Sequence, residues 1–259
     1  MDTELYESIA VDHGRSAMQL RAADEKTGVF VGGQPTVGEG LEWPMKNGRP
    51  LGFLGQVSLH ELPPSSLNHW LPSTGALLFF YDFFDLPLGN EPVDAGGWSV
   101  MYVPEGECEG PLVAPEEPIF SKHFKGESFV SIPSVDRFEP GAEDPFEGSY
   151  ELYDELIESA YEDEAMHQIG GYPIPEGDDK MEFECQLYSE GIFGSGAYEE
   201  EDPEVEQALE ATNDWKLLFQ FHAEDEDDFP FLGKMYFWIR EADARELIFD
   251  KVWMLRQEV

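Results

Sequence analysis

The 259-residue sequence is poor in basic residues: 15 lysines and arginines stand against 55 aspartates and glutamates, a formal net charge of −40. Such a surface repels the phosphates of nucleic acids and anionic membranes, and it attracts cations and basic proteins. We therefore expect neither a nucleic-acid partner nor a membrane partner. Salt-adapted proteins carry similar surfaces to stay hydrated, so the acidity leaves function and habitat as two open explanations.

Cysteines and long apolar runs are also scarce. Cys108 and Cys185 lie far apart with no Cys-x-x-Cys pair, which indicates neither a zinc site nor a disulfide framework. No stretch approaches the roughly 18 uninterrupted apolar residues of a membrane span. Residues 1–7 lack the basic region and apolar run of a signal peptide, so we expect a cytoplasmic protein.

Catalytic signatures are missing as well. The sequence has no His-Glu-x-x-His, no Gly-x-Ser-x-Gly and no phosphate-binding loop with its lysine. The six histidines are scattered, which favours surface or capping roles, and only His222 lies close to a repeated motif. We assign no catalytic residue, no metal ligand and no cofactor, and an enzyme is the less favoured reading.

Three blocks occur twice in the same order: a Gly-Gly-x-Pro turn, a glutamine-containing strand and a glycine-led aromatic strand. They occupy residues 32–40, 53–57 and 74–82 in the first copy, and 170–177, 217–221 and 232–240 in the second. Three blocks in order indicate an internal duplication. The second copy is longer between its first two blocks, and an acidic helical insertion near 198–214 accounts for the difference.

A glutamine lies within each repeated strand, Gln56 and Gln220, with apolar residues on both strand faces. Strands that are apolar on both faces are interior strands. An unpaired buried amide costs roughly 1–3 kcal/mol, so each glutamine must find hydrogen-bond partners. Backbone groups of the Gly-Gly-x-Pro turn suit it, because the amide offers two donors and an acceptor. The alternative is that Gln56, Gln220 and His222 line a cleft between the two halves.

These patterns predict an α+β fold, internally duplicated, with largely antiparallel sheets and peripheral helices. We expect an N-terminal helical segment at 1–26, a first half at 27–134, a linker at 135–148 and a second half at 149–259. The best predicted helix is 149–166, where an apolar stripe faces a row of glutamates. Shorter elements are a helix at 240–249 and a last strand at 251–255, and all are expected to pack as one compact unit.

Several stretches resemble the YwqG-like family of bacterial proteins of unknown function. In the first half the similarity runs through VGGQP, EWP, GRPLGFLGQVSLHELP and LPSTGALLFFYD; in the second it runs through HQIGGYP, ECQL, DWKLLFQF, GKMYFWI and DARELIFDKVW. The resemblance implies an α+β fold rich in antiparallel strands and no catalytic residues to carry over. It also implies a plausible role for some members as immunity proteins of toxin systems. A Trp-Gly-Asp tripeptide frequent in the family is replaced here by 229–234, in which Pro230 and Gly233 are suited to a turn.

Two acidic clusters are the strongest polar feature of the chain. The residues that we expect to bind a partner are Glu199, Glu200, Glu201, Asp202, Glu224, Asp225, Asp227 and Asp228. The leading hypothesis is a non-enzymatic acidic binding protein, specifically an immunity protein that neutralises a basic toxin domain. The alternative is a hydrolase or small-ligand-binding protein that uses the inter-half cleft. The sequence carries no signal for an oligomeric state.

Overall fold

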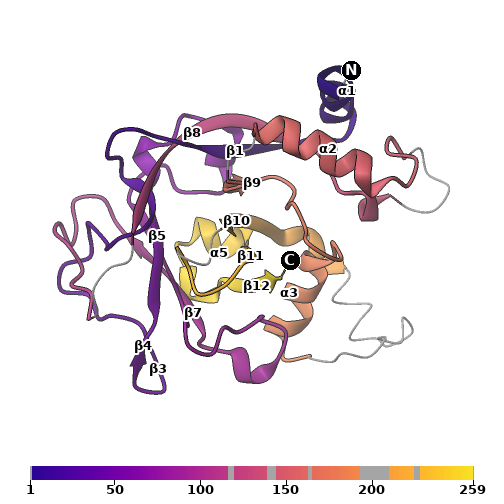
Figure 1. Cartoon of the computed structure of the whole chain (residues 1–259). Coiled ribbons are helices and arrows are strands. Elements are labelled where there is room, and N and C mark those ends of the chain that lie inside the picture. Colours follow the sequence, from indigo (N-terminus) through magenta and orange to yellow (C-terminus); the bar gives the residue numbers. More distant parts are fainter. Residues whose placement is uncertain are drawn as a thin grey trace.

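The computed structural model describes residues 2–115, 120–138, 144–162, 165–192, 210–224 and 228–258, and its main feature is a ten-stranded antiparallel sheet (Figure 1). The strands are β1 (Arg15–Ala22), β2 (Val29–Gly32), β5 (Gly52–Ser58), β6 (Ala76–Tyr81), β7 (Trp98–Val103), β8 (Ser121–Ser131), β9 (Gln168–Gly170), β10 (Trp215–Ala223), β11 (Gly233–Arg240) and β12 (Trp253–Gln257). The described helices are α1 (Asp2–His13), α2 (Tyr150–Tyr161), α3 (Met181–Ser189) and α5 (Glu241–Arg245), and a separate hairpin consists of β3 (Met45–Lys46) and β4 (Arg49–Pro50). The expected α+β class with antiparallel strands is therefore confirmed.

The order of the strands is symmetric about the central β1–β8 pair. Across the sheet it runs β12-β11-β10-β9-β1-β8-β2-β5-β6-β7. In the chain, however, β1 precedes β2, β5, β6 and β7, whereas β8 precedes β9, β10, β11 and β12. Strand β1 therefore lies beside β9, which follows β8 in the chain, and β8 lies beside β2, which follows β1, so the N-terminal and C-terminal parts of the sheet are interlocked.

The sheet curls until its two end strands meet, which gives an arrangement close to a barrel. Trp98 on β7 and Trp253 on β12 make an edge-to-face contact with ring centroids 5.1 Å apart. The Trp98 indole N–H donates to the Val252 carbonyl, and the Arg256 backbone N–H donates to the Leu88 carbonyl, both at 2.9 Å. Side chains and a loop thus close the sheet, because β7 and β12 share no ladder among the described strands.

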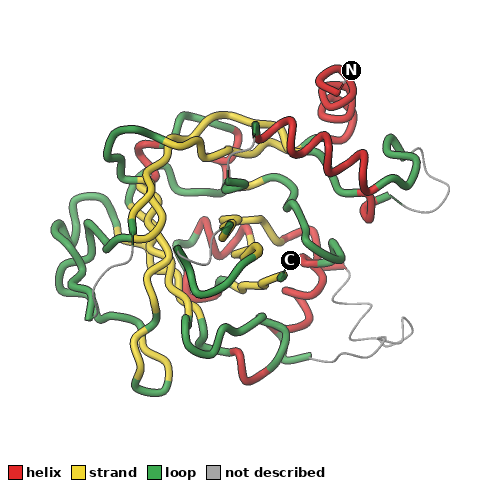
Figure 2. Tube along the Cα trace, in the orientation of Figure 1, coloured by secondary structure: helices red, strands yellow, loops and turns green. Residues whose placement is uncertain are grey.

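Aromatic side chains from both halves fill the interior of the curled sheet. Phe79 on β6 packs against Phe219 on β10 and Phe237 on β11, with ring centroids 4.9 and 5.1 Å apart. The outer faces have separate covers: α3 packs over β10–β12, α1 and α2 pack near β8, and loops cover β5 and β6. Figure 2 shows α1 and α2 together at one end of the molecule. The space between the halves is therefore core and not a cleft.

The stretch that replaces the Trp-Gly-Asp tripeptide forms a turn that packs into this core. Phe229 and Phe231 are buried, and their rings lie 5.9 Å apart. Gly233 has φ of 104°, and a Cβ there would lie 2.3 Å from the Gln257 carbonyl oxygen. Only glycine fits both the conformation and the space, which agrees with the turn expected at this position.

Helix α2 follows directly from its sequence. The Ser149 side chain accepts a hydrogen bond from the Leu152 N–H and caps the first turn. Buried Leu156 and Ile157 lie on its inner face, and the helix ends where Glu162 adopts a left-handed conformation with φ of 53°. The predicted helix at 149–166 is confirmed, although it ends at Tyr161.

The prediction of a helical segment over 1–26 is wrong in its second part. Helix α1 ends at His13, and Arg15–Ala22 forms β1, the central strand that pairs with both β8 and β9. Met18 and Leu20 are both buried in the core, and their two-residue spacing is that of a strand. Few apolar residues mark this segment, so the change of period from helix to strand was easily missed.

Other boundaries also shift. The C-terminal helix is shorter than 240–249, and the last strand lies at Trp253–Gln257 instead of 251–255. In the described part of the proposed linker 135–148, Val135 and Phe146 are buried beside α2, so these residues belong to the core. The insertion near 198–214 lies almost entirely outside the described residues, and the division into halves remains a prediction. No described helix combines the length and apolar composition needed to cross a membrane.

Two truncations test the role of the central strand. Removal of residues 1–13 takes away α1 alone, and we expect the shortened chain to retain strand content and cooperative unfolding. Removal of residues 1–22 also takes away β1, which exposes the inner edges of β8 and β9 and deletes buried Met18 and Leu20. We expect that chain not to fold, as measured by circular dichroism and urea titration. Cooperative unfolding of the chain that lacks residues 1–22 would contradict the interlocked arrangement.

Candidate functional site

Gln56 lies on β5 with 1% of its surface exposed, and its amide is fully engaged by backbone and hydroxyl groups. Its Oε1 accepts from the Thr36 N–H at 2.9 Å. Its Nε2 donates to the Thr36 hydroxyl at 2.8 Å and to the Gly28 carbonyl at 3.4 Å. The amide therefore joins the Gly-Gly-x-Pro turn to the residue that precedes β2.

Gln220 on β10 makes the equivalent bonds in the other half. Its Oε1 accepts from the Ile174 N–H at 2.8 Å, and its Nε2 donates to the Met166 carbonyl at 2.6 Å. Thr36 and Ile174 each directly follow the proline of the turn. The expectation that each glutamine binds its Gly-Gly-x-Pro turn is therefore confirmed.

Local backbone geometry repeats around the two glutamines. The pairing register shifts between Phe53 and Gly55 on β5, and between Leu217 and Phe219 on β10, at the same distance from the glutamine. The two glycines of each turn all have positive φ, between 68° and 76°: Gly32, Gly33, Gly170 and Gly171. A residue with a Cβ is strained there, so the paired glycines are required by the turn that the amide holds.

The proposed cleft residues do not come together. Gln56 and Gln220 are buried in different halves, on the sheet face that points away from the shared aromatic interior. His222 on β10 is mostly buried, and its Nδ1 accepts from the Met166 N–H at 3.2 Å. All three side chains hold backbone in place, and none is presented to an open space between the halves.

His167 is a buried group that the sequence analysis missed. Its Nδ1 accepts the backbone N–H of His222 at 3.1 Å, and its ring packs against Phe124, with centroids 4.9 Å apart. Burial lowers the pKa of His167 to about 3, and burial lowers the pKa of His222 to about 4. Both imidazoles are therefore neutral at neutral pH. The available sequence signal for the burial of His167 was its position directly before Gln168, a residue that pairs with Gln220.

The acidic clusters are only partly within the described residues. Glu199, Glu200, Glu201, Asp202, Asp225 and Asp227 lie outside them. Glu224 has 46% of its side chain exposed, and partial burial raises its pKa. Asp228 forms an ion pair with Lys122 at 2.7 Å. Of the two described carboxylates, Glu224 remains open to a partner and Asp228 is already neutralised.

The basic side chains are almost all used within the protein. Of the 15 lysines and arginines, 12 lie within 4.0 Å of a carboxylate oxygen: Arg15, Arg21, Lys46, Arg49, Lys122, Lys125, Arg137, Lys216, Lys234, Arg245, Lys251 and Arg256. One partly buried example is Arg137, which binds Asp179 and Glu182 together. The surplus of carboxylates is therefore not offset by free cations.

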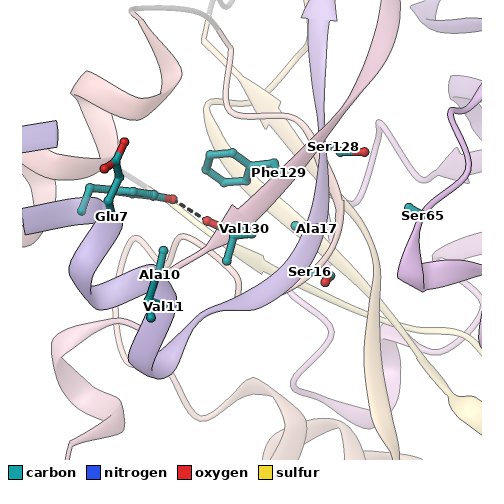
Figure 3. A pocket seen from close by; sticks show the side chains of 10 residues that line it. Glu7, Ala10, Val11, Ser16, Ala17, Ser65, Ser128, Phe129 and Val130 are labelled. Carbon is teal, nitrogen blue, oxygen red and sulfur yellow. Dashed lines mark hydrogen bonds between the residues drawn. The ribbon is translucent and has the colours of Figure 1, made fainter. Parts of the chain in front are cut away.

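A surface hollow of about 660 Å³ lies between α1 and the β1–β8 pair (Figure 3). Its wall on α1 is formed by Tyr6, Glu7, Ala10 and Val11, and strand residues including Ser128 and Val130 form much of the rest. The Tyr6 hydroxyl donates to the carbonyl of Val130 at 2.9 Å. The hollow combines an apolar lining with one carboxylate, which suits binding more than chemistry.

The described residues contain no cluster of three or more His, Cys, Asp or Glu side chains placed to hold a metal ion. Buried charged groups are held in internal pairs in the Arg137–Asp179 and Lys234–Glu176 contacts, both at 2.5 Å. What the described surface offers a partner is negative charge, an apolar hollow and exposed backbone.

Replacement of either buried glutamine tests its structural role. We expect Gln56→Leu and Gln220→Leu each to lower the free energy of unfolding by about 1–3 kcal/mol, because each leaves a turn N–H buried without an acceptor. Urea unfolding measures the loss. Gln257→Leu is the control, because Gln257 also accepts backbone hydrogen bonds but lies nearer the surface. This control should lower the free energy of unfolding by less. Equal stability of the Gln220 variant and the unmodified protein would contradict the assignment.

His167 predicts a pH dependence of stability. Its pKa is about 3 in the folded state and about 6.5 when unfolded, so its stabilising contribution is complete above about pH 6.5 and is lost as the pH falls toward about 3. Relative to His167→Asn, which keeps an acceptor for the His222 N–H, the unmodified protein should lose up to about 1.4 kcal/mol per pH unit in this window. Urea titrations between about pH 7 and pH 5 measure the difference. Parallel pH profiles would show that His167 is not buried neutral.

Comparison with known proteins adds one assignment. No curated protein matches the chain. One family matches residues 30–257, which is most of the sequence. The match covers all strands from β3 to β12 and includes Gln56 and Gln220. The chain therefore belongs to the family described as Domain of unknown function (DUF1963).

Proposed function

We infer that this protein is a non-enzymatic binding protein that acts in the cytoplasm on a basic protein partner. The observation that carries the proposal is the intramolecular pairing of the basic side chains. Of the 15 lysines and arginines, 12 already lie within 4.0 Å of a carboxylate of the same chain. A surface with net charge of −40 and few free cations attracts a basic protein from any direction.

The mechanism is electrostatic attraction followed by occlusion. Long-range attraction raises the association rate, and contacts at short range determine the lifetime of the complex. The acidic residues 199–202, together with Glu224 and its neighbours 225 and 227, are the proposed steering groups. Asp228 is the weakest member of the set, because Lys122 already neutralises it.

An immunity protein that neutralises a basic toxin domain is the specific form of this proposal. The support is the resemblance to YwqG-like proteins, for which such a role is plausible, together with the acidic surface. The test is co-expression with the product of an adjacent gene that encodes a secreted protein with a toxin-like C-terminus. Rescue of growth by this protein supports immunity, and continued toxicity despite its expression argues against it.

The alternative of a hydrolase or small-ligand-binding protein that uses a cleft between the halves has no observation in its favour among the described residues. Gln56 and Gln220 are saturated by backbone partners, and aromatic side chains occupy the space between the halves.

Charge variants test the steering step. The test set is Glu199→Gln, Glu200→Gln, Glu201→Gln and Asp202→Asn, and the control set removes the same number of exposed carboxylates from α2: Glu151→Gln, Asp154→Asn, Glu155→Gln and Glu158→Gln. Stopped-flow association with a fluorescent poly-lysine peptide is measured at about 10 mM salt, where the Debye length is about 30 Å. We expect the test set to slow association several-fold more than the control set. Equal slowing by both sets would assign the attraction to net charge alone and remove the role of residues 199–202.

A further inference from the structure

Strand β8 has an open edge in the middle of the sheet. It pairs with β1 over Phe124–Ser131, but its other neighbour, β2, pairs with it only over Ser121–His123. Beyond His123, no described strand lies on the second side of β8. Most of the longest strand of the sheet therefore has one unpaired edge.

The direction of the backbone groups on this edge follows from two hydrogen bonds. The Phe124 carbonyl accepts from the Thr27 hydroxyl at 2.8 Å, and the Val130 carbonyl accepts from the Tyr6 hydroxyl at 2.9 Å, so both carbonyls point away from β1. In an antiparallel pair alternate residues share this orientation. Gly126 and Ser128 therefore also point their N–H and C=O groups outward.

These outward groups are available to a partner. Within the described part of the chain, the backbone groups of Gly126 and Ser128 and the N–H of Val130 make no hydrogen bond. Ser128 is exposed, and Val130 is 42% exposed. Natural sheets usually cover or blunt such an edge, because it templates the addition of another strand. Here the side chains at 126 and 128 are small, so a second backbone can approach closely.

The surroundings of the edge define the chemistry of its occupant. The apolar hollow on α1 lies at the Val130 end and carries the carboxylate of Glu7 on its wall. Glu127 on β8 has 65% of its side chain exposed and lies 3.8 Å from Arg21, a guanidinium that Glu162 also approaches at 3.6 Å. The ammonium group of Lys125 is neutralised by Glu25 at 2.6 Å. The strip is therefore acidic, with an adjacent apolar recess and no uncompensated cation among these groups.

A second copy of this chain is an unfavourable occupant, because two surfaces of net charge −40 repel each other. We propose that the β8 edge at residues 126–130 binds an extended, lysine- or arginine-bearing segment of a partner protein by strand addition. The added strand exchanges backbone hydrogen bonds with Gly126, Ser128 and Val130. Its basic side chains lie beside Glu7 and Glu127, and an apolar side chain enters the hollow. The proposal rests on the proposed function, since it names the binding mode of the basic partner.

Residue-resolved hydrogen exchange tests the proposal, with a synthetic peptide of alternating lysine and valine as the probe. In the free protein we expect fast exchange at the amides of Gly126, Ser128 and Val130, and slow exchange at those of Lys125, Glu127 and Phe129, which face β1. Saturating peptide should slow the first group about tenfold or more and leave the second group unchanged. The same peptide with alternate backbone amides methylated keeps its charge but cannot add as a strand, and it should protect none of them.

A matched pair of variants completes the test. Ser128→Pro removes one outward N–H and places a ring on the open edge, whereas Ser128→Ala keeps the backbone donor. We expect the proline variant to bind the peptide about tenfold more weakly and the alanine variant to bind normally, with circular dichroism to verify folding. Peptide binding without protection at 126, 128 and 130 overturns strand addition but leaves the proposed function intact. Protection that rises with protein concentration in the absence of peptide identifies a second copy as the occupant and overturns the proposal. Absence of binding to both the alternating and poly-lysine peptides at low salt removes the proposed function itself.

Discussion

Each half of the sheet depends on one buried amide that must satisfy its hydrogen-bonding groups. The Gln56 and Gln220 side chains reach from interior strands to the N–H of the residue after the turn proline, at 2.9 and 2.8 Å. No aliphatic side chain can accept these bonds, and an N–H left unpaired in the core is costly. The strand, its bulge and the double-glycine turn are thus held in one arrangement in each half, and the same saturation leaves neither glutamine free for a ligand.

The interlocked halves move any binding function to the surface. Because β1 pairs with β9 and β8 pairs with β2, the N-terminal and C-terminal strands share a single aromatic interior around Phe79, Phe219 and Phe237. A partner must then be recognised from outside. The negative charge of the surface has a separate origin, because 55 aspartates and glutamates stand against only 15 lysines and arginines.

Charge and backbone geometry coincide at β8. An open edge is normally a risk of self-association, and a high net charge of one sign reduces that risk, because like-charged copies repel. The same charge favours a basic partner strand. In the proposed binding mode, the acidic surface and the open edge together discriminate between another copy of this chain and a cationic partner.

The sequence by itself determined the elements whose signals are local or repeated. These are the capped α2 helix, the two interior glutamine strands with their turns, the α+β class and the acidic character. The repeat also anticipated that Gln56 and Gln220 would hold equivalent turns, because a buried amide has few alternatives to nearby backbone. Local signals did not reveal the strand at residues 15–22. There the strand follows directly after a helix, and only the two-residue spacing of buried Met18 and Leu20 marks it.

Only the tertiary structure decided how the strands are shared between halves, where the sheet closes and which edge stays open. Those features depend on pairings between residues more than 100 positions apart, such as Arg15 with Ser131, and no local preference encodes such a partner. Tertiary contacts likewise decided that His167 is buried and neutral, and that Asp228 is neutralised by Lys122 from a distant strand. Residue type and spacing specify which secondary structure a segment can form. The neighbours of that segment in space determine which of its polar groups remain available to a partner.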